Sequence, residues 1–250
     1  MINQEENGPV GFILINKPKG ANSFRTIAQI RRILEQRKLK AGYAGTLDPF
    51  ATGLLIVGIG REATRELHTI TRWDKRYIAR AKLGEQTDTL DCTGQVIEMC
   101  NAQDITEEKL FSAIKRIGNN YQQTPPLYSA LKHEGVPLYK HARKKGKTAQ
   151  DLQDVLSAKS RSVTLHEVTL IDFTWPFFTI EAHVSHGTYI RTLVNDIARN
   201  AGSCATTQEL KRTAVGNVGL ENATDLDALK TPDDILSRLI DVNVFVSRYF

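Results

Sequence analysis

Short apolar runs, bounded by glycine, proline and polar residues, predict buried β-strands along the chain. The two most apolar runs are residues 12–15 and 54–59, and turn-forming residues stop each of them. Residues 163–174 and 177–185 are predicted as two further strands, with Trp175 and Pro176 as the turn between them.

Helices are predicted where apolar residues recur at a spacing of three or four. One follows Ser23, the expected N-cap, with apolar residues on one face of 24–34 and basic residues on the other. A short helix is expected over 61–69, and another over 189–200 that Gly202 ends. Strands occur in runs without steady βαβ alternation. The pattern therefore favours an α+β fold around a mixed or antiparallel sheet.

Composition is that of a soluble globular protein, with 41% hydrophobic and 24% charged residues among 250. No secretory signal and no membrane-spanning run is recognisable, which predicts a cytoplasmic protein without a membrane partner. Cys92, Cys100 and Cys204 form no C-x-x-C pair, so we expect three incidental thiols in a reducing compartment. A net charge of +5 is compatible with a nucleic-acid partner, although many basic proteins bind none.

Several motifs suggest other chemistry but lack the residues that would complete it. Residues 58–63 match G-x-G-x-x-A, yet no acidic residue ends the strand about 20 positions later, which argues against a dinucleotide site. Asp88 and Asp91 could bind a metal ion, but two carboxylates in one loop more often cap turns. The histidines have no metal-binding spacing. We therefore expect no metal and no cofactor.

The most informative segment is 44–55, Ala-Gly-Thr-Leu-Asp-Pro-Phe-Ala-Thr-Gly-Leu-Leu. Residues 42–49 are predicted as a turn-rich loop, and Pro49 keeps Asp48 out of the α region. Here the chain resembles the TruB-type tRNA pseudouridine synthases. The resemblance extends over most of the chain through motifs in the expected order, at 11–20, 45–55, 75–77, 84–91, 128–132, 187–193 and 210–213.

The resemblance implies a pseudouridine synthase fold, with a central mixed or antiparallel sheet flanked by helices and an active-site cleft across the sheet. It implies a catalytic domain over 1–222 with an RNA-gripping insertion at about 121–152. Residues 223–250 would be a short C-terminal tail, with the RNA-binding PUA domain of many relatives absent or vestigial. We also expect a monomer.

The resemblance makes Asp48 the catalytic carboxylate. Either nucleophilic attack on the sugar or proton abstraction requires this carboxylate to be ionised, and burial alone would oppose ionisation. Arg191 is the matching cation that would keep it charged. Tyr77 matches the aromatic residue that stacks on the flipped-out base.

Four further residues are carried over from the family. Leu210 matches an apolar wall of the pocket, and Lys17 and Lys132 are expected to contact RNA or to support the pocket. Tyr43 stands where the family commonly has a histidine that helps to displace T-loop nucleotides. Tyr43 is therefore expected to stack on RNA.

The implied activity is isomerisation of uridine to pseudouridine at position 55, in the T-loop of tRNA. Two alternatives remain open. A non-catalytic tRNA-binding or tRNA-folding protein of the same fold is suggested by Tyr43 and the missing C-terminal domain. A metal-dependent nuclease would use Asp88 and Asp91.

Overall fold

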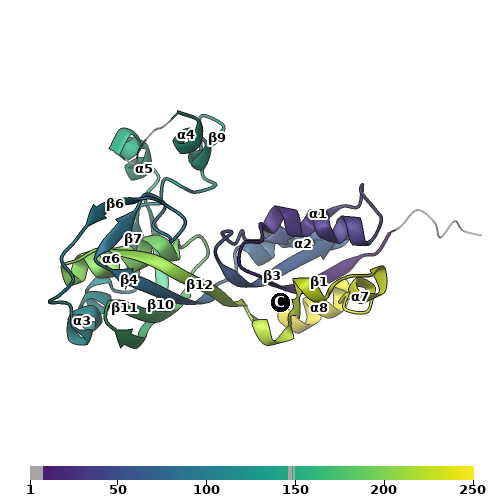
Figure 1. Ribbon diagram of the computed structural model, residues 1–250. Helices are drawn as coiled ribbons and strands as arrows, with labels where there is room; N and C mark the ends of the chain where they lie inside the picture. The colour runs from purple at the N-terminus through teal and green to yellow at the C-terminus, as the bar shows by residue number, and fades with distance from the viewer. Residues whose placement is uncertain (1–7, 146–147, 149) are drawn as a thin grey trace, which may run out of the picture. The chain divides into compact units, whose positions relative to one another are not determined.

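The computed structural model describes residues 8–145, 148 and 150–250. The chain forms two compact units (Figure 1). Unit 1 comprises residues 1–76 and 211–250, and unit 2 comprises residues 77–210. The two chain crossings between the units lie inside strands, β4 (Lys75–Leu83) and β12 (Ala205–Val215).

The sheet of unit 1 is centred on β1 (Gly11–Lys17) and β3 (Thr52–Ile59), which pair antiparallel along their whole length. The C-terminal part of β12 runs parallel to β3, with Lys211 opposite Thr52. Three shorter strands complete it: β2 (Ala41–Ala44) beside β3, β13 (Val218–Gly219) beside β12, and β14 (Thr224–Asp225) beside β1. The sheet is mixed, as predicted.

Helices cover both faces of this sheet, which explains why β1 and β3 are apolar without alternation. Phe12 and Leu14 on one face share a core with α2 (Gly60–Thr71) and α8 (Val242–Tyr249). Ile13 and Ile15 on the other face share a core with α1 (Ser23–Ile33) and α7 (Pro232–Leu236).

The segment predicted as a C-terminal tail contributes to the core of unit 1. Phe245 and Ile235 are fully buried, and the ring of Phe245 stacks on that of Phe12 at 4.1 Å between centroids. The 3₁₀ helices η2 (Leu220–Asn222) and η3 (Leu226–Ala228) lie between β13 and α7. No boundary between compact units falls at Asn222.

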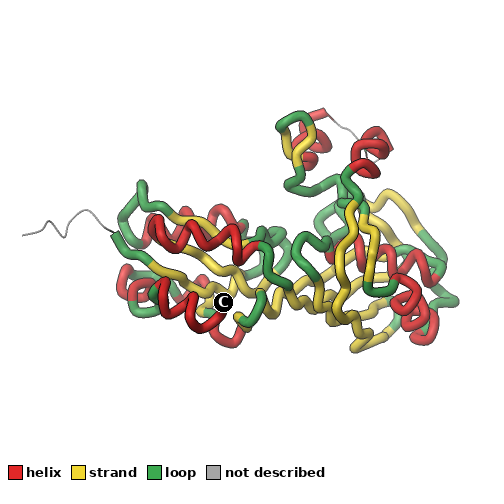
Figure 2. Tube along the Cα trace, turned by 180° about the vertical axis from the view of Figure 1, so that it is seen from behind, coloured by secondary structure: helices red, strands yellow, loops and turns green. Residues whose placement is uncertain are grey.

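Unit 2 contains a sheet with helices packed against it, in which β10 pairs antiparallel with both of its neighbours. Its strand order is β4, β11 (Phe177–Val184), β10 (Arg161–Thr174) and β7 (Asn120–Gln123). Two helices, α3 (Glu107–Ile117) and α6 (Ile190–Ala201), pack on each other, and β5 (Glu85–Thr87) pairs with β6 (Val96–Met99). Figure 2 shows these helices in red outside the yellow strands. The predicted α+β class is confirmed.

A small lobe projects from the sheet of unit 2 in both views (Figures 1 and 2). It consists of β8 (Lys132–His133), β9 (Val136–Pro137), α4 (Leu138–Lys145), η1 (Gln150–Leu152) and α5 (Gln153–Ala158). Its own core is formed by Leu127, Leu138, Ala142, Leu152 and Leu156. The lobe coincides with most of the predicted insertion, and residues 146 and 147 of its basic stretch lie outside the described residues.

No helix among the described residues is both long enough and apolar enough to cross a membrane.

Candidate active site

Asp48 lies in the connection between β2 and β3 of unit 1. Tyr43 and Ala44 on β2 pair with Val57 and Ile56 on β3, so residues 45–51 form a loop closed by an antiparallel pair. The predicted loop is thus shorter at its start, because residues 41–44 form β2. A turn in which the Ala51 amide donates to the Asp48 carbonyl, at 3.1 Å, shapes the loop's end. The Asp48 side chain is half-buried.

Ser23 holds this loop against the start of α1. The amide of Leu47 donates to the Ser23 hydroxyl at 3.1 Å, and the hydroxyl donates to the Leu47 carbonyl at 3.0 Å. The prediction that Ser23 caps α1 is wrong, because Asn22 accepts from the Phe24 amide in that role. Ser23 instead fixes the residue that precedes Asp48.

Lys17 supports the Asp48 loop through hydrogen bonds to backbone carbonyls. Its side chain is fully buried, and its ammonium donates to the carbonyls of Pro18, Ala21 and Ala51. All three of its protons are therefore used inside unit 1. These bonds support the Asp48 loop, and the expected role of Lys17 toward RNA stays a prediction.

Arg212 is a functional candidate that the sequence reasoning missed. Its side chain is buried, its Nε donates to the Leu54 carbonyl at 2.8 Å, and its Nη2 donates to the Gly45 carbonyl at 3.0 Å. It therefore joins the start of the Asp48 loop to β3. Side chains alternate along a strand, so Arg212 lies on the same face of β12 as the buried Leu210. This alternation could have indicated from the sequence that Arg212 is buried.

The close approach of β12 to the loop requires a glycine at position 53. Gly53 has φ +105°, and a Cβ there would lie 2.2 Å from the Arg212 carbonyl oxygen. We expect Gly53→Ala to lower the free energy of unfolding by about 2 kcal/mol or more, because both the backbone conformation and the contact become strained. Urea unfolding would measure this. Gly20→Ala is the matched control: Gly20 also has a positive φ, +84°, but a Cβ there would have no neighbour within 4 Å. Equal losses would contradict the close-approach argument.

Buried positive charge surrounds the loop. Burial lowers the pKa of Lys17 from 10.5 to about 8, while the charge of Asp48 raises it and that of Arg212 lowers it. Burial, reinforced by Arg212, also lowers the pKa of Lys75 to about 8. Lys75 donates to the carbonyls of Thr71 and Trp73. The attraction between Lys17 and Asp48 operates within unit 1 and favours the charged form of Lys17.

The Lys17 shift makes stability depend on pH in a defined direction. Between pH 8 and 10.5 the unfolded chain binds more protons at Lys17 than the folded chain, so Lys17 should make the folded state more stable as pH rises. The gain is at most about 3 kcal/mol. Chemical unfolding of the wild type and of Lys17→Met would be measured at pH 7.5, 9 and 10.5. The free energy of unfolding of the wild type should rise relative to that of the variant as pH increases. A difference independent of pH would contradict it.

Arg191 lies in unit 2, in the first turn of α6. Its side chain is buried, and its Nη1 lies 3.6 Å from a carboxylate oxygen of Asp91, which is also buried. Its guanidinium donates to the carbonyls of Thr89 and Tyr128. Arg191 therefore has a partner carboxylate, Asp91, within unit 2. The expected pairing with Asp48, which belongs to unit 1, stays a prediction.

Asp88 and Asp91 cap turns, which is the role that the sequence favoured over metal binding. The Thr93 amide donates to Asp91 at 2.9 Å, and the Gln95 amide donates to Asp88 at 2.9 Å. Asp88 also accepts from the Tyr128 hydroxyl at 2.9 Å, which connects the loop to the base of the small lobe.

The remaining predicted site residues occupy different places. Tyr77 is half-buried on β4 and begins unit 2, and Leu210 is buried on β12 and ends it. Lys132 is exposed on β8 of the small lobe. Tyr43 packs against the α1 face of the unit 1 core. Their expected contacts with RNA stay predictions.

Two cysteines of unit 2 form a disulfide, which corrects the expectation of three incidental thiols. Cys100 follows β6 and Cys204 precedes β12, with 5.8 Å between their Cα atoms and 104 positions between them in the sequence. Spacing could not reveal a pair so distant. The Gly84 amide donates to the Cys204 carbonyl, and the Cys100 amide to the Gly84 carbonyl, so the disulfide lies beside the loop that holds Asp91.

Reduction of this disulfide should lower the free energy of unfolding by about 3–5 kcal/mol, because a loop this long gains much entropy in the unfolded chain. Thermal or urea unfolding with and without dithiothreitol would measure the loss. Cys92→Ser should keep the sensitivity to dithiothreitol, and Cys100→Ser should abolish it. A wild type indifferent to reductant would contradict the prediction.

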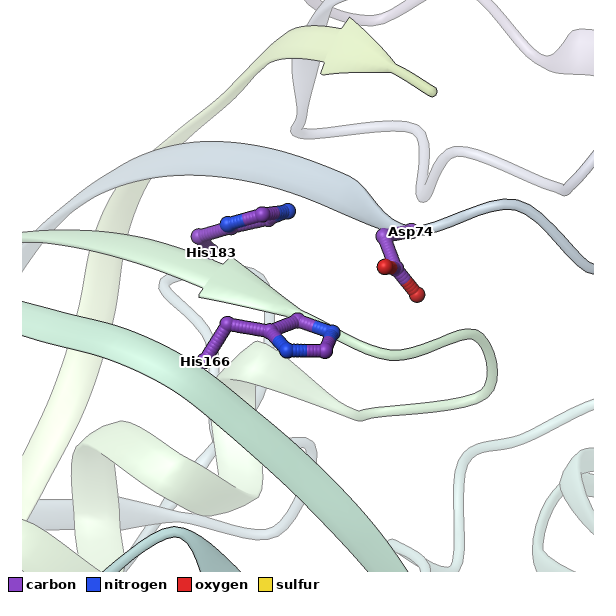
Figure 3. A group of neighbouring side chains, drawn as sticks. All are labelled: Asp74, His166 and His183. Atoms are coloured by element: carbon purple, nitrogen blue, oxygen red, sulfur yellow. The ribbon is translucent and has the colours of Figure 1, made fainter.

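His166 and His183 lie side by side on β10 and β11, with 4.6 Å between ring centroids (Figure 3). Asp74, also labelled there, belongs to unit 1. Two imidazoles are fewer ligands than a zinc site uses, and we assign them no metal.

Comparison with known proteins identifies the class. The sequence model of the TruB family pseudouridylate synthases (N-terminal domain) matches residues 31–190. A tRNA pseudouridine synthase B of Actinobacillus succinogenes is 38% identical over 220 residues, which are 88% of this chain and 67% of the relative. That of Neisseria meningitidis is 36% identical over 252 residues, 100% of this chain and 78% of the relative.

The fold is also found in solved structures. A crystal structure of a Cbf5-Nop10-Gar1 complex matches with a TM-score of 0.65 and 26% identity, over 87% of this chain and 53% of that chain. The chain thus spans about half the length of that protein. Fold and sequence together place the chain among the pseudouridylate synthases. Within that class, it belongs to the TruB family.

Proposed function

We propose that the protein isomerises uridine to pseudouridine at position 55 in the T-loop of tRNA, with Asp48 as the catalytic carboxylate. The observation that carries the proposal is the support of the Asp48 loop from three directions. Ser23, Lys17 and Arg212 all bond to its backbone and leave the carboxylate half-buried. A carboxylate aimed by a rigid loop is what positioned catalysis requires. The tRNA-modifying relatives support the choice of substrate.

The reaction breaks the bond between N1 of the base and the sugar, turns the base, and rejoins it through C5. The target nucleotide must first be flipped out of the T-loop, which costs a few kcal/mol. Stacking on Tyr77 would offset about 1–3 kcal/mol of this. Asp48 would then either attack the sugar carbon or abstract a sugar proton, and Arg191 would stabilise its charge.

The partner in this proposal is the T arm of tRNA, bound by a monomer. The small lobe, with the exposed Lys132, would grip the RNA, and Leu210 and Tyr43 would contact the displaced nucleotides. The proposal includes no metal or cofactor, because the rearrangement leaves the oxidation state of the substrate unchanged and adds no group to it. The site of action would be the cytoplasm.

A T-arm stem-loop labelled with tritium at C5 of the target uridine tests the proposal. Pseudouridine formation replaces the C5 proton, so the purified protein should release tritium over many turnovers, with or without a chelator. Binding of the stem-loop without release of tritium would sink the proposal and favour a non-catalytic tRNA-binding protein. Activity lost on chelation would instead favour a metal-dependent reaction.

A further inference from the structure

A second site lies in unit 1, at the end of β3 opposite to the Asp48 loop. Lys40, Arg61, Thr64 and Arg65 line a hollow of about 430 Å³ beside the first turns of α2. We call these four residues the basic pocket. The eight residues of β3 separate it from the Asp48 loop, which corresponds to about 24 Å along the strand.

The backbone around the pocket is held by specific bonds. The Gly60 amide, at the start of α2, donates to the Lys40 carbonyl at 2.7 Å. Arg31 on α1 donates through Nε to the Leu39 carbonyl at 2.9 Å and through Nη2 to the Ala41 carbonyl at 3.3 Å. These bonds fix the backbone of Lys40 beside the start of α2.

Positive charge is concentrated at the start of α2, where Glu62 is the acidic residue of the first turn. Arg61 lies in the first turn of α2, where the helix dipole disfavours a cation. Arg61 and Arg65 are four positions apart on one helical face, where like charges repel. Within the described part of the chain, Lys40, Arg61 and Arg65 form no ion pair, although Glu62 lies between the two arginines in sequence. No side chain caps the first amides of α2, whose N-cap residue is Ile59.

We propose that the basic pocket binds a backbone phosphate of the RNA substrate. Two guanidinium groups, an ammonium and uncapped helix amides are the donors that phosphate binding uses in proteins. The proposal rests on the proposed function in one respect, because it takes RNA as the partner. With the pocket some 24 Å from Asp48 along β3, the phosphate would lie beyond the flipped nucleotide and its neighbours.

The test compares Arg61→Ala/Arg65→Ala with the wild type in binding to an unmodified tRNA transcript at several salt concentrations. Both arginines are exposed helical residues, so the variant should fold. We expect affinity to fall about tenfold, and the plot of log affinity against log salt to become shallower by about 1–2. The turnover number at saturating tRNA should not change. Arg61→Lys/Arg65→Lys should bind tRNA nearly as well as the wild type.

The control variant is Lys230→Ala/Arg248→Ala, which removes the same charge from exposed positions elsewhere in unit 1. If it weakens tRNA binding as much as the pocket variant does, or if the pocket variant binds like the wild type, the proposal is overturned. Calorimetry with inorganic phosphate gives a further test. If the pocket variant loses phosphate binding but keeps the tRNA affinity of the wild type, the pocket does not bind the RNA and the proposal is overturned. Binding is measured without turnover, so a wild type that binds tRNA but forms no pseudouridine would refute the proposed function and not the pocket.

Discussion

Asp48→Asn should bind tRNA with the affinity of the wild type and form pseudouridine at least about 10⁴-fold more slowly. The amide is nearly isosteric with the carboxylate but carries no charge and is neither a nucleophile nor a base. The support of the loop comes from backbone bonds of Leu47, Ala51 and Gly45, which the substitution leaves in place. Single-turnover tritium release and filter binding would measure the two effects separately.

Asp227→Asn is the matched control, since it makes the same chemical change at an exposed position of unit 1. It should leave turnover unchanged. Full turnover by Asp48→Asn would remove Asp48 from the mechanism. If Asp48→Asn lost both binding and folding, Asp48 would have a structural role that the bonds around it do not indicate.

The second large effect is expected at Arg191. Arg191→Ala leaves the buried Asp91 without its cation, which should lower the free energy of unfolding by about 3–5 kcal/mol. Turnover should be lost as well, because Asp48 would lose the charge that we propose to stabilise it. Urea unfolding and tritium release would measure the two losses.

A double variant separates stability from catalysis. In Arg191→Ala/Asp91→Asn the unpaired buried charge is removed, so a substantial part of the lost stability should return. Activity should not return, because neither new side chain is a cation. An active double variant would show that Arg191 acts only by stabilising unit 2.

The sequence predicts best those features that depend on neighbouring residues. The apolar runs 12–15 and 54–59 lie in β1 and β3, and Gly202 ends α6 in the left-handed conformation. Each of these follows from local hydrophobic pattern or from the conformational freedom of glycine. The family resemblance, carried by ordered motifs, is confirmed by the family match.

The features that the sequence did not reveal depend on contacts between distant residues. Serine is a common helix N-cap, but the Ser23 hydroxyl forms hydrogen bonds with the backbone of Leu47, 24 positions later. Arg212 bonds to Gly45, 167 positions earlier, and the disulfide joins cysteines 104 positions apart. Residues 223–250 are predicted as a tail by the family resemblance, yet Phe245 and Ile235 are buried in the core of unit 1. The local pattern of hydrophobic and polar residues does not indicate which distant residues will contact each other.

The most direct test of the account is a map of pseudouridine in an unmodified tRNA transcript after incubation with the purified protein. The account predicts pseudouridine at position 55 of the T-loop with the wild type, and none with Asp48→Asn. Absence of pseudouridine with the wild type, or equal formation by the variant, would contradict it.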